Sequence, residues 1–226
     1  MGPFLPAVMA DVVIDVSHWQ AQVDFARLRE AGIAAAILKA SEGRGAVDPL
    51  YAERAAAARQ AGLLLGAYHF LDHSDGAAQA DHFLATAAPD GTPCADLFVA
   101  LDLEPDPGGS SAAPEIAAAA AARIREKFGR WPVIYVGRWT IAAPNELLAR
   151  CPLWLPEYGA SPVCPPGWRQ WVLWQHTDGQ AGVSPQPVPG VGACDRSRFA
   201  GSLEQLRHWW PGAAADPAWN QKGETP

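Results

Sequence analysis

The chain has 226 residues, of which 49% are hydrophobic, and its formal net charge is −7. This length and composition fit one globular domain with a sizeable core and exclude a disordered chain. The acidic balance, without any cluster of Lys and Arg, argues against nucleic-acid binding, and no apolar run reaches the ~18–20 residues that span a bilayer.

Strand and helix patterns alternate along most of the chain. The expected strands are residues 12–17, 34–40, 63–70, 97–104 and 133–136. The expected helices are residues 25–31, 48–61, 76–87 and 114–128. In the second helix we expect Asp48 as the N-cap and Pro49 at the first position. The pattern then weakens into a short helix (145–150), two strands (153–155 and 171–175), a loop rich in Pro and Gly, and a last helix (203–209).

Apolar strands that alternate with helices are typical of a parallel sheet covered by helices. A closed barrel and an open doubly wound sheet both fit this count of elements. Polar residues recur at the carboxyl ends of the strands, and in a barrel these ends converge on one mouth. They are Asp15, Ser17, Lys39, Glu42, Tyr68, His69, Asp102, Glu104, Tyr135, Trp154, Glu157 and Gln175. We therefore predict an α/β fold, a TIM-like barrel over residues 11–211, with an N-terminal extension (1–10) and a flexible C-terminal tail (212–226).

Residues 97–104 form the most informative segment, because an apolar run ends in Asp102 and Glu104. Side chains alternate along a strand, so these two carboxylates lie on the same face with Cα atoms roughly 6.5–7 Å apart. Two acids this close push each other's pKa values apart, which lets one hold a proton while the other is ionised. This is the requirement for cutting a glycosidic bond. The alternative is a strand end that turns into solvent, where Asp and Glu are common.

Several aromatic residues are candidates for contact with a sugar, since a flat apolar ring matches a pyranose face. The candidates at strand ends are Tyr68, Tyr135, Trp154 and Trp174, and core packing is an equal alternative for each. We expect His18 and Trp19 to form a rim. Lys39 is a candidate partner for an acid or for an anionic substrate group.

The sequence gives no sign of a metal or cofactor site, and we expect neither. Cys94, Cys151, Cys164 and Cys194 lack C-x-x-C spacing, so we expect free thiols, with Cys151–Cys164 as the pairing to suspect in an oxidising compartment. His69 and His73 are four residues apart, but this spacing aligns ligands only on a helix, and these two leave a strand. We expect His69 to make structural hydrogen bonds.

Six segments in order resemble the family 25 glycoside hydrolases, the Chalaropsis-type lysozymes or N-acetylmuramidases. The segments are Asp15-Val-Ser-His-Trp-Gln20, Lys39-Ala-Ser-Glu-Gly43, Gly66-Ala-Tyr-His-Phe70, Leu101-Asp-Leu-Glu104, Ile134-Tyr135 and Leu173-Trp-Gln175. The resemblance runs from about residue 12 to residue 210. It implies a modified β/α barrel with five regular units and a less regular closing portion. It also implies hydrolysis of the β-1,4 bond between N-acetylmuramic acid and N-acetylglucosamine in peptidoglycan.

Carried over by motif, the resemblance makes Glu104 the general acid, Asp102 the second carboxylate, and Asp15 and Asp195 the other acids of the site. Asp102 could attack C1 directly or orient the 2-acetamido group as an internal nucleophile. The resemblance favours the second route, and we expect net retention. Alternatively, Asp15 caps the next loop, and Asp195 pairs with its neighbour Arg196. Lys39 could bind the lactyl carboxylate of the muramyl unit.

Two other functions remain open from the sequence: a barrel that binds glycan without cutting it, and a hydrolase of another aminoglycan such as chitin. The expected partner is the peptidoglycan glycan strand, with no nucleic acid and no membrane span, and the expected state is a monomer. The first ten residues do not read as a secretory signal. We expect the protein to act on the bacterial cell wall. It would reach the wall through a holin, through a dedicated export system, or with a leader that has been removed. Whether an immunity protein binds it is left open.

Overall fold

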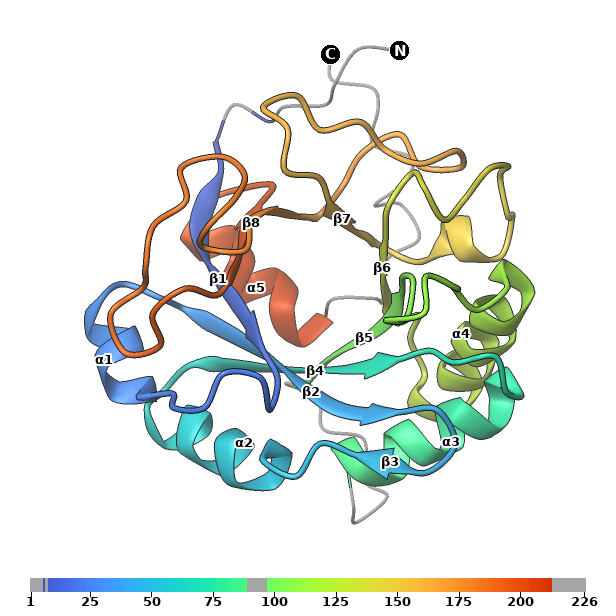
Figure 1. Ribbon diagram of the computed structural model, residues 1–226, viewed down its shortest axis with the longest axis horizontal. Helices are drawn as coiled ribbons and strands as arrows, with labels where there is room; N and C mark the ends of the chain where they lie inside the picture. The colour runs from blue at the N-terminus through green and yellow to red at the C-terminus, as the bar shows by residue number, and fades with distance from the viewer. Residues whose placement is uncertain (1–5, 7, 89–96, 213–226) are drawn as a thin grey trace.

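The computed structural model describes residue 6 and residues 8–88 and 97–212. Within these residues, eight strands form a barrel in the order β1-β9-β8-β7-β6-β5-β4-β2, and pairing of β1 with β2 closes it (Figure 1). The short strand β3 pairs antiparallel with the end of β2. The strands are β1 (Ala10–Val16), β2 (Ala35–Glu42), β3 (Ala46–Val47), β4 (Leu64–Phe70), β5 (Phe98–Leu103), β6 (Val133–Val136), β7 (Leu153–Pro156), β8 (Leu173–Thr177) and β9 (Asp195–Phe199). The prediction of a modified TIM-like barrel is confirmed.

The helices are α1 (Phe25–Glu30), α2 (Tyr51–Gln60), α3 (Gly76–Ala87), α4 (Pro114–Phe128) and α5 (Leu203–Gly212), with one 3₁₀ turn, η1 (Leu148–Arg150). The bounds of α3 and α4 coincide with the expected ones, and Gly129 ends α4 in the left-handed region at φ 77°. The expected start of α2 at residue 48 is wrong. Asp48 instead accepts hydrogen bonds from the backbone N–H groups of His18 and Leu50, so its side chain joins the loop after β1 to the approach to α2.

The closing portion differs most from the expected pattern. A loop was expected where β9 lies. This strand runs antiparallel to both β1 and β8, so the barrel is not purely parallel. This strand escapes prediction because it carries charges on its outer face. Arg196 and Arg198 lie 3.0 and 3.5 Å from the carboxylate of Asp11 on β1, which compensates those charges. The expected helix at 145–150 is only the short turn η1.

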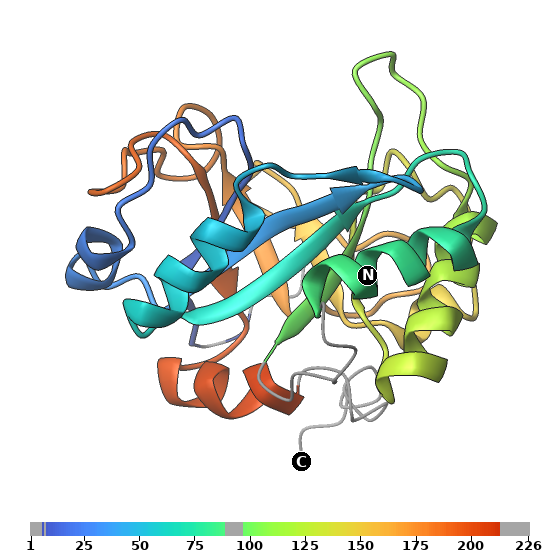
Figure 2. The same cartoon turned by 90° about the horizontal axis from the view of Figure 1, so that it is seen from below.

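The base of the barrel is closed by apolar side chains and by α5, at the end opposite the long loops (Figure 2). Trp210 of α5 stacks on Phe98 with ring centroids 4.5 Å apart and donates its indole N–H to the Leu65 carbonyl at 2.9 Å. A Cβ at Gly66 would lie 2.9 Å from Phe98 and 3.2 Å from Trp210, so this position requires glycine. The filled base leaves the mouth as the accessible end of the barrel.

The described part of the chain contains three of the four cysteines. Cys151, Cys164 and Cys194 are free thiols, so the suspected Cys151–Cys164 bridge is not formed, and Cys94 lies outside the described residues. The expected tail lies outside them as well, apart from residue 212. Among the described helices, none is long and apolar enough to cross a membrane.

Candidate active site

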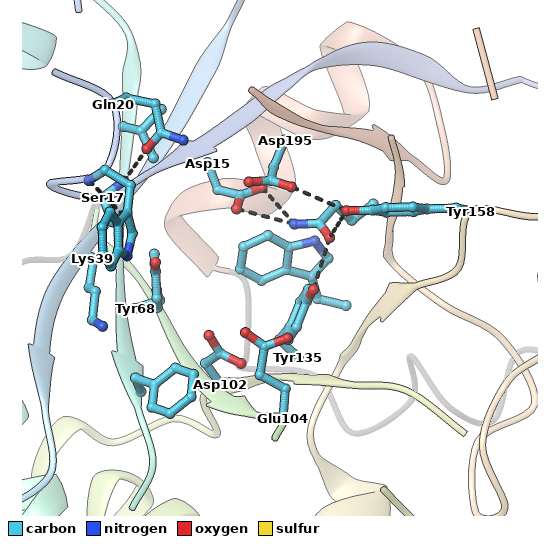
Figure 3. Close-up of a pocket in the computed structure, with 15 residues that line it drawn as sticks. Asp15, Ser17, Gln20, Lys39, Tyr68, Asp102, Glu104, Tyr135, Tyr158 and Asp195 are labelled. Carbon is cyan, nitrogen blue, oxygen red and sulfur yellow. Dashed lines mark hydrogen bonds between the residues drawn. The ribbon is translucent and has the colours of Figure 1, made fainter. Parts of the chain in front are cut away.

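A polar cavity of about 340 Å³ opens at the carboxyl ends of the barrel strands (Figure 3). Its lining comes from all eight strands of the barrel and from loops that follow some of them. The lining residues are Asp15, Val16, Ser17, Trp19, Gln20, Lys39, Tyr68, Phe70, Asp102, Glu104, Tyr135, Trp154, Tyr158, Gln175 and Asp195. The cavity therefore brings together the four acids and most of the strand-end residues selected from the sequence.

The first pair of acids comes from β5 and the residue after it. Asp102 and Glu104 both face the cavity, as alternation along the strand predicts (Figure 3). Asp102 is only 6% exposed, and its Oδ1 has no hydrogen-bond partner among the described residues. Burial, then repulsion from Glu104, raises the pKa of Asp102 well above its usual range. Burial, then the charge of Asp195, raises the pKa of Glu104 to about 7.

The second pair of acids lies at the seam where the barrel closes. Asp15 on β1 and Asp195 on β9 are paired directly opposite each other in the antiparallel register, which sets their side chains side by side (Figure 3). Like charges in this arrangement oppose ionisation. Burial, then Asp195, raises the pKa of Asp15 well above its usual range. Burial raises the pKa of Asp195 to about 6, against the opposing effect of a hydrogen bond from Tyr158.

Gln175 of β8 links the seam pair to two tyrosines. Its amide nitrogen lies 3.2 Å from both carboxylate oxygens of Asp15 and donates to that group. Its amide oxygen accepts the hydroxyl of Tyr135 at 2.8 Å, and the hydroxyl of Tyr158 lies 3.5 Å from the same oxygen. Tyr158 also donates to Asp195 at 3.3 Å. Because both ends of the amide have partners, the Gln175 side chain holds one orientation and in turn fixes the orientation of the Asp15 carboxylate.

Lys39 is the cation in the described lining of the cavity. Its ammonium group lies 2.6 Å from Glu42 and 5.0 Å from the centre of the Phe70 ring. The positive charge acts against the rise in pKa at both Asp102 and Glu104. The cavity thus holds four carboxylates and one ammonium group, so full ionisation would leave a large uncompensated charge in a confined space.

The four aromatic candidates divide into two groups. Tyr68, Tyr135 and Trp154 line the cavity, and the indole of Trp154 donates to Ser197 at 2.9 Å, which fixes its ring. Trp174 lies on the opposite face of β8 from Gln175, because neighbouring residues of a strand alternate. It is 1% exposed and donates to the Glu157 carbonyl at 2.5 Å. Trp174 therefore packs in the core outside the barrel and has no surface on the cavity.

The polar residues that do not reach the cavity have structural contacts. His69 is completely buried, with its ring nitrogens 2.8 Å from the Ser41 hydroxyl and 3.2 Å from the Gln79 amide oxygen. Burial lowers the pKa of His69 to about 4, so the ring is neutral. Glu157 lies 3.8 Å from Arg138 at the surface. In the part of the chain that the structure describes, no group of three His, Cys, Asp or Glu residues could hold a metal ion.

The sequence did not indicate four of the cavity residues, which are Val16, Gln20, Phe70 and Tyr158. Tyr158 follows β7 by two positions, so its placement depends on the path of a loop that has no periodic pattern. Phe70 ends β4, and its apolar side chain gave no sign of function. Gln20 accepts the backbone N–H of Ser17 at 2.9 Å and forms part of the loop after β1. Polar residues at strand ends were therefore easier to predict than residues of the loops.

Comparison with known proteins gives consistent results across sequence and structure. The model of the glycosyl hydrolases family 25 matches residues 14–183. The chain is 31% identical over 214 residues to Lysozyme M1 of Streptomyces globisporus, covering 85% of this chain and 69% of that protein. It is 32% identical over 185 residues to an N,O-diacetylmuramidase of Chalaropsis sp, covering 74% and 88%. A bacterial lysozyme from Streptomyces coelicolor superposes with a TM-score of 0.75 at 29% identity, covering 91% and 99%.

Proposed function

The chain belongs to glycosyl hydrolase family 25 and is a glycoside hydrolase, and on this premise we propose that it hydrolyses bacterial peptidoglycan. The bond cleaved is the β-1,4 linkage between N-acetylmuramic acid and N-acetylglucosamine. The lysozyme and muramidase relatives support this choice of substrate. The site of action is the bacterial cell wall, and the protein works as a monomer.

The observation that carries this proposal is the raised pKa of Glu104 together with its position beside Asp102. A general acid works best when its pKa lies near the working pH, and burial raises the pKa of Glu104 to about 7. At neutral pH the group is therefore partly protonated and can give its proton to the glycosidic oxygen. Asp102 lies two residues away on the same face, where a second carboxylate is needed to stabilise positive charge at the sugar.

Asp102 acts through the free oxygen on its carboxylate. The unpartnered Oδ1 is a buried acceptor, which costs free energy until a donor reaches it. The N–H of a substrate acetamido group is such a donor, and its binding would favour the ionised form of Asp102. Repulsion between the two carboxylates is mutual, so an ionised Asp102 helps Glu104 retain its proton. Substrate binding thus favours an ionised Asp102 and a protonated Glu104.

The reaction proceeds in two balanced steps. The acetamido carbonyl oxygen attacks C1 while Glu104 protonates the leaving oxygen, so the C1–O bond breaks and a cyclic oxazolinium ion forms, with its N–H held by Asp102. Water then attacks C1 from the opposite face and gives its proton to Glu104, and the C–O bond of the ring opens. Two inversions at C1 give net retention.

The other cavity residues hold the sugars in place. Asp15 and Asp195 accept hydrogen bonds from sugar hydroxyl or amide groups, with Gln175 fixing Asp15. Tyr68, Tyr135 and Trp154 contact the sugar rings or the acetamido group. Lys39 binds the lactyl carboxylate of the muramyl unit, exchanging part of its ion pair with Glu42 for the substrate.

Mass spectrometry of the products from purified peptidoglycan tests the proposal. Wild type is compared with Glu104→Gln and with Glu146→Gln, which makes the same change at an exposed glutamate. We expect fragments with reducing-end N-acetylmuramic acid from wild type and Glu146→Gln but not from Glu104→Gln. Reducing-end N-acetylglucosamine would change the cleaved bond, and no fragments from wild type would favour a binding protein or another glycan. Proton NMR of the first anomer released tests retention.

A further inference from the structure

One aromatic side chain at the mouth is exposed although its loop is held in place. Trp19 lines the cavity and is 80% exposed, whereas five other tryptophans are buried. Covering the large apolar surface of an exposed indole is favourable in free energy, and such surfaces mark binding sites when they border a cavity. The position calls for an explanation because most of this ring remains exposed in the described structure.

The loop that carries Trp19 is tied to α2 at several points. Arg54 of α2 donates to the carbonyl oxygens of Ser17 and Gln20, on both sides of Trp19. Asp48 accepts both the backbone N–H and the ring Nδ1 of His18, each at 2.9 Å. These attachments hold the backbone on both sides of Trp19, so the loop cannot move away from the mouth without breaking them, including the buried bond from Arg54 to Ser17.

The ring itself has a neighbour on one side. The imidazole of His18 lies against the indole of Trp19 with ring centroids 4.9 Å apart and planes tilted by 34°. Because His18 is held by Asp48, the indole orientation is supported while its remaining surface faces solvent. A preorganised flat surface binds a partner with a smaller loss of conformational entropy than a mobile side chain.

We propose that Trp19 is a stacking platform for a sugar ring of the glycan strand outside the two units that flank the cleaved bond. This inference rests on the proposed function. The apolar face of a pyranose presents C–H groups, which match the electron-rich face of an indole. Trp19 follows β1, and β2 and β4 separate β1 from β5, which leads to Glu104. The platform therefore rises from a different side of the mouth than the acid, which suits a more distant sugar.

Cleavage of glycan fragments of two lengths tests this assignment. The shorter fragment is the disaccharide of N-acetylmuramic acid linked to N-acetylglucosamine, which holds only the two units that flank the cleaved bond, and the longer one has four disaccharide repeats. Both are free of peptide and are digested by wild type, Trp19→Ala and Trp19→Tyr. We expect Trp19→Ala to lower kcat/KM about tenfold on the longer fragment, the size of one lost aromatic contact, and less than twofold on the shorter one. Trp19→Tyr, which keeps an aromatic face, should recover most of the loss. Equal losses on both fragments, or no loss on either, would overturn the proposal.

Trp139→Ala is the matched control, because Trp139 is 59% exposed and follows β6 at the same end of the barrel but does not line the cavity. It should leave both rates unchanged, and a loss equal to that of Trp19→Ala would contradict a specific platform. If wild type cleaves neither fragment, the proposed function fails, and calorimetric binding of the longer fragment decides the inference separately. About tenfold weaker binding by Trp19→Ala would support the platform, and equal or absent binding would overturn it.

Discussion

The two ends of the same barrel have opposite character. At the base, Trp210, Phe98 and their neighbours fill the interior with apolar side chains, and the indole N–H has a backbone acceptor. At the mouth, four carboxylates share one cavity with Lys39, and Oδ1 of Asp102 has no partner among the described residues. The base therefore contributes stability, whereas burial of the acids at the mouth costs stability.

The comparison indicates that the fold tolerates an unfavourable mouth because its base and surrounding helices are well packed. Raised pKa values at Asp15, Asp102, Glu104 and Asp195 mean that ionising these groups is harder in the folded chain than in the unfolded one. Functional sites commonly store such a cost. Substitutions at the mouth should therefore change activity more than stability, and those at the base should do the reverse.

Glu104→Gln should produce the largest effect on activity. Glutamine has nearly the same shape but cannot give a proton, so kcat should fall about 10³-fold. The free energy of unfolding at pH 7 should stay equal or rise, because a buried ionisable group has been removed. Initial rates on purified cell walls and denaturant unfolding measure the two quantities.

The pH profile of the wild type sharpens this prediction. Because the acid must be protonated, kcat/KM should fall as pH rises through about 7, the pKa of Glu104. A variant Glu104→Gln that keeps wild-type rates, or a wild-type profile without a falling limb near this pH, would assign the acid to another residue.

Trp210→Ala should produce the largest effect on stability. It leaves a cavity against Phe98 and Gly66 at the base and should lower the free energy of unfolding by about 3–5 kcal/mol. The activity per folded molecule should remain near that of wild type, because the mouth is built from the opposite strand ends. Trp139→Ala, at an exposed tryptophan, should cost less than about 1 kcal/mol. Equal costs for the two variants would mean that the base does not carry the stability.

The pH dependence of stability should show the cost of the mouth directly. Between the unfolded and folded pKa values of a buried acid, the folded state binds more protons, so stability falls as pH rises. For Glu104 this window runs from about 4.5 to about 7, and the rise in pKa corresponds to about 3 kcal/mol. The difference in unfolding free energy between wild type and Glu104→Gln should therefore shift in favour of the variant across this window. For the exposed pair, wild type and Glu146→Gln, it should stay flat.

The mouth and the base also differ in how far the sequence could predict them. Strand alternation places Asp102 and Glu104 on one face, and the β/α repeat brings Asp15, Lys39 and Tyr68 to the same end, so these positions were accessible from local pattern. The closure of the barrel was not. The pairing of Asp195 with Asp15 depends on β9, whose polar sequence does not show the pattern of a strand. The contacts of Tyr158 depend on the path of a loop.

The packing of the base was equally hidden. The sequence predicted a last helix over residues 203–209, one residue short of Trp210, and the position of α5 across the end of the barrel follows from long-range contacts of Trp210 with Phe98 and Leu65. For Trp174 the sequence left contact with sugar and core packing as equal alternatives, and in the structure Gln175 and not Trp174 faces the cavity. A slip of one residue in a strand reverses the face of every side chain, which limits any prediction from pattern alone.

Gln175→Met should produce the smallest of these effects and should separate positioning from packing. Methionine fills a similar volume but cannot donate to Asp15 or accept from Tyr135, so the pKa of Asp15 should rise further and its orientation should loosen. We expect kcat/KM to fall about tenfold. The acid limb of the pH profile, which is the low-pH range where kcat/KM rises with pH, should move to higher pH. Loss of a purely structural residue would lower the amount of folded protein without moving that limb. An unmoved limb with reduced stability would therefore place Gln175 with the packing residues, and a moved limb would show that its hydrogen bond favours ionisation of Asp15 against the effects of burial and of Asp195.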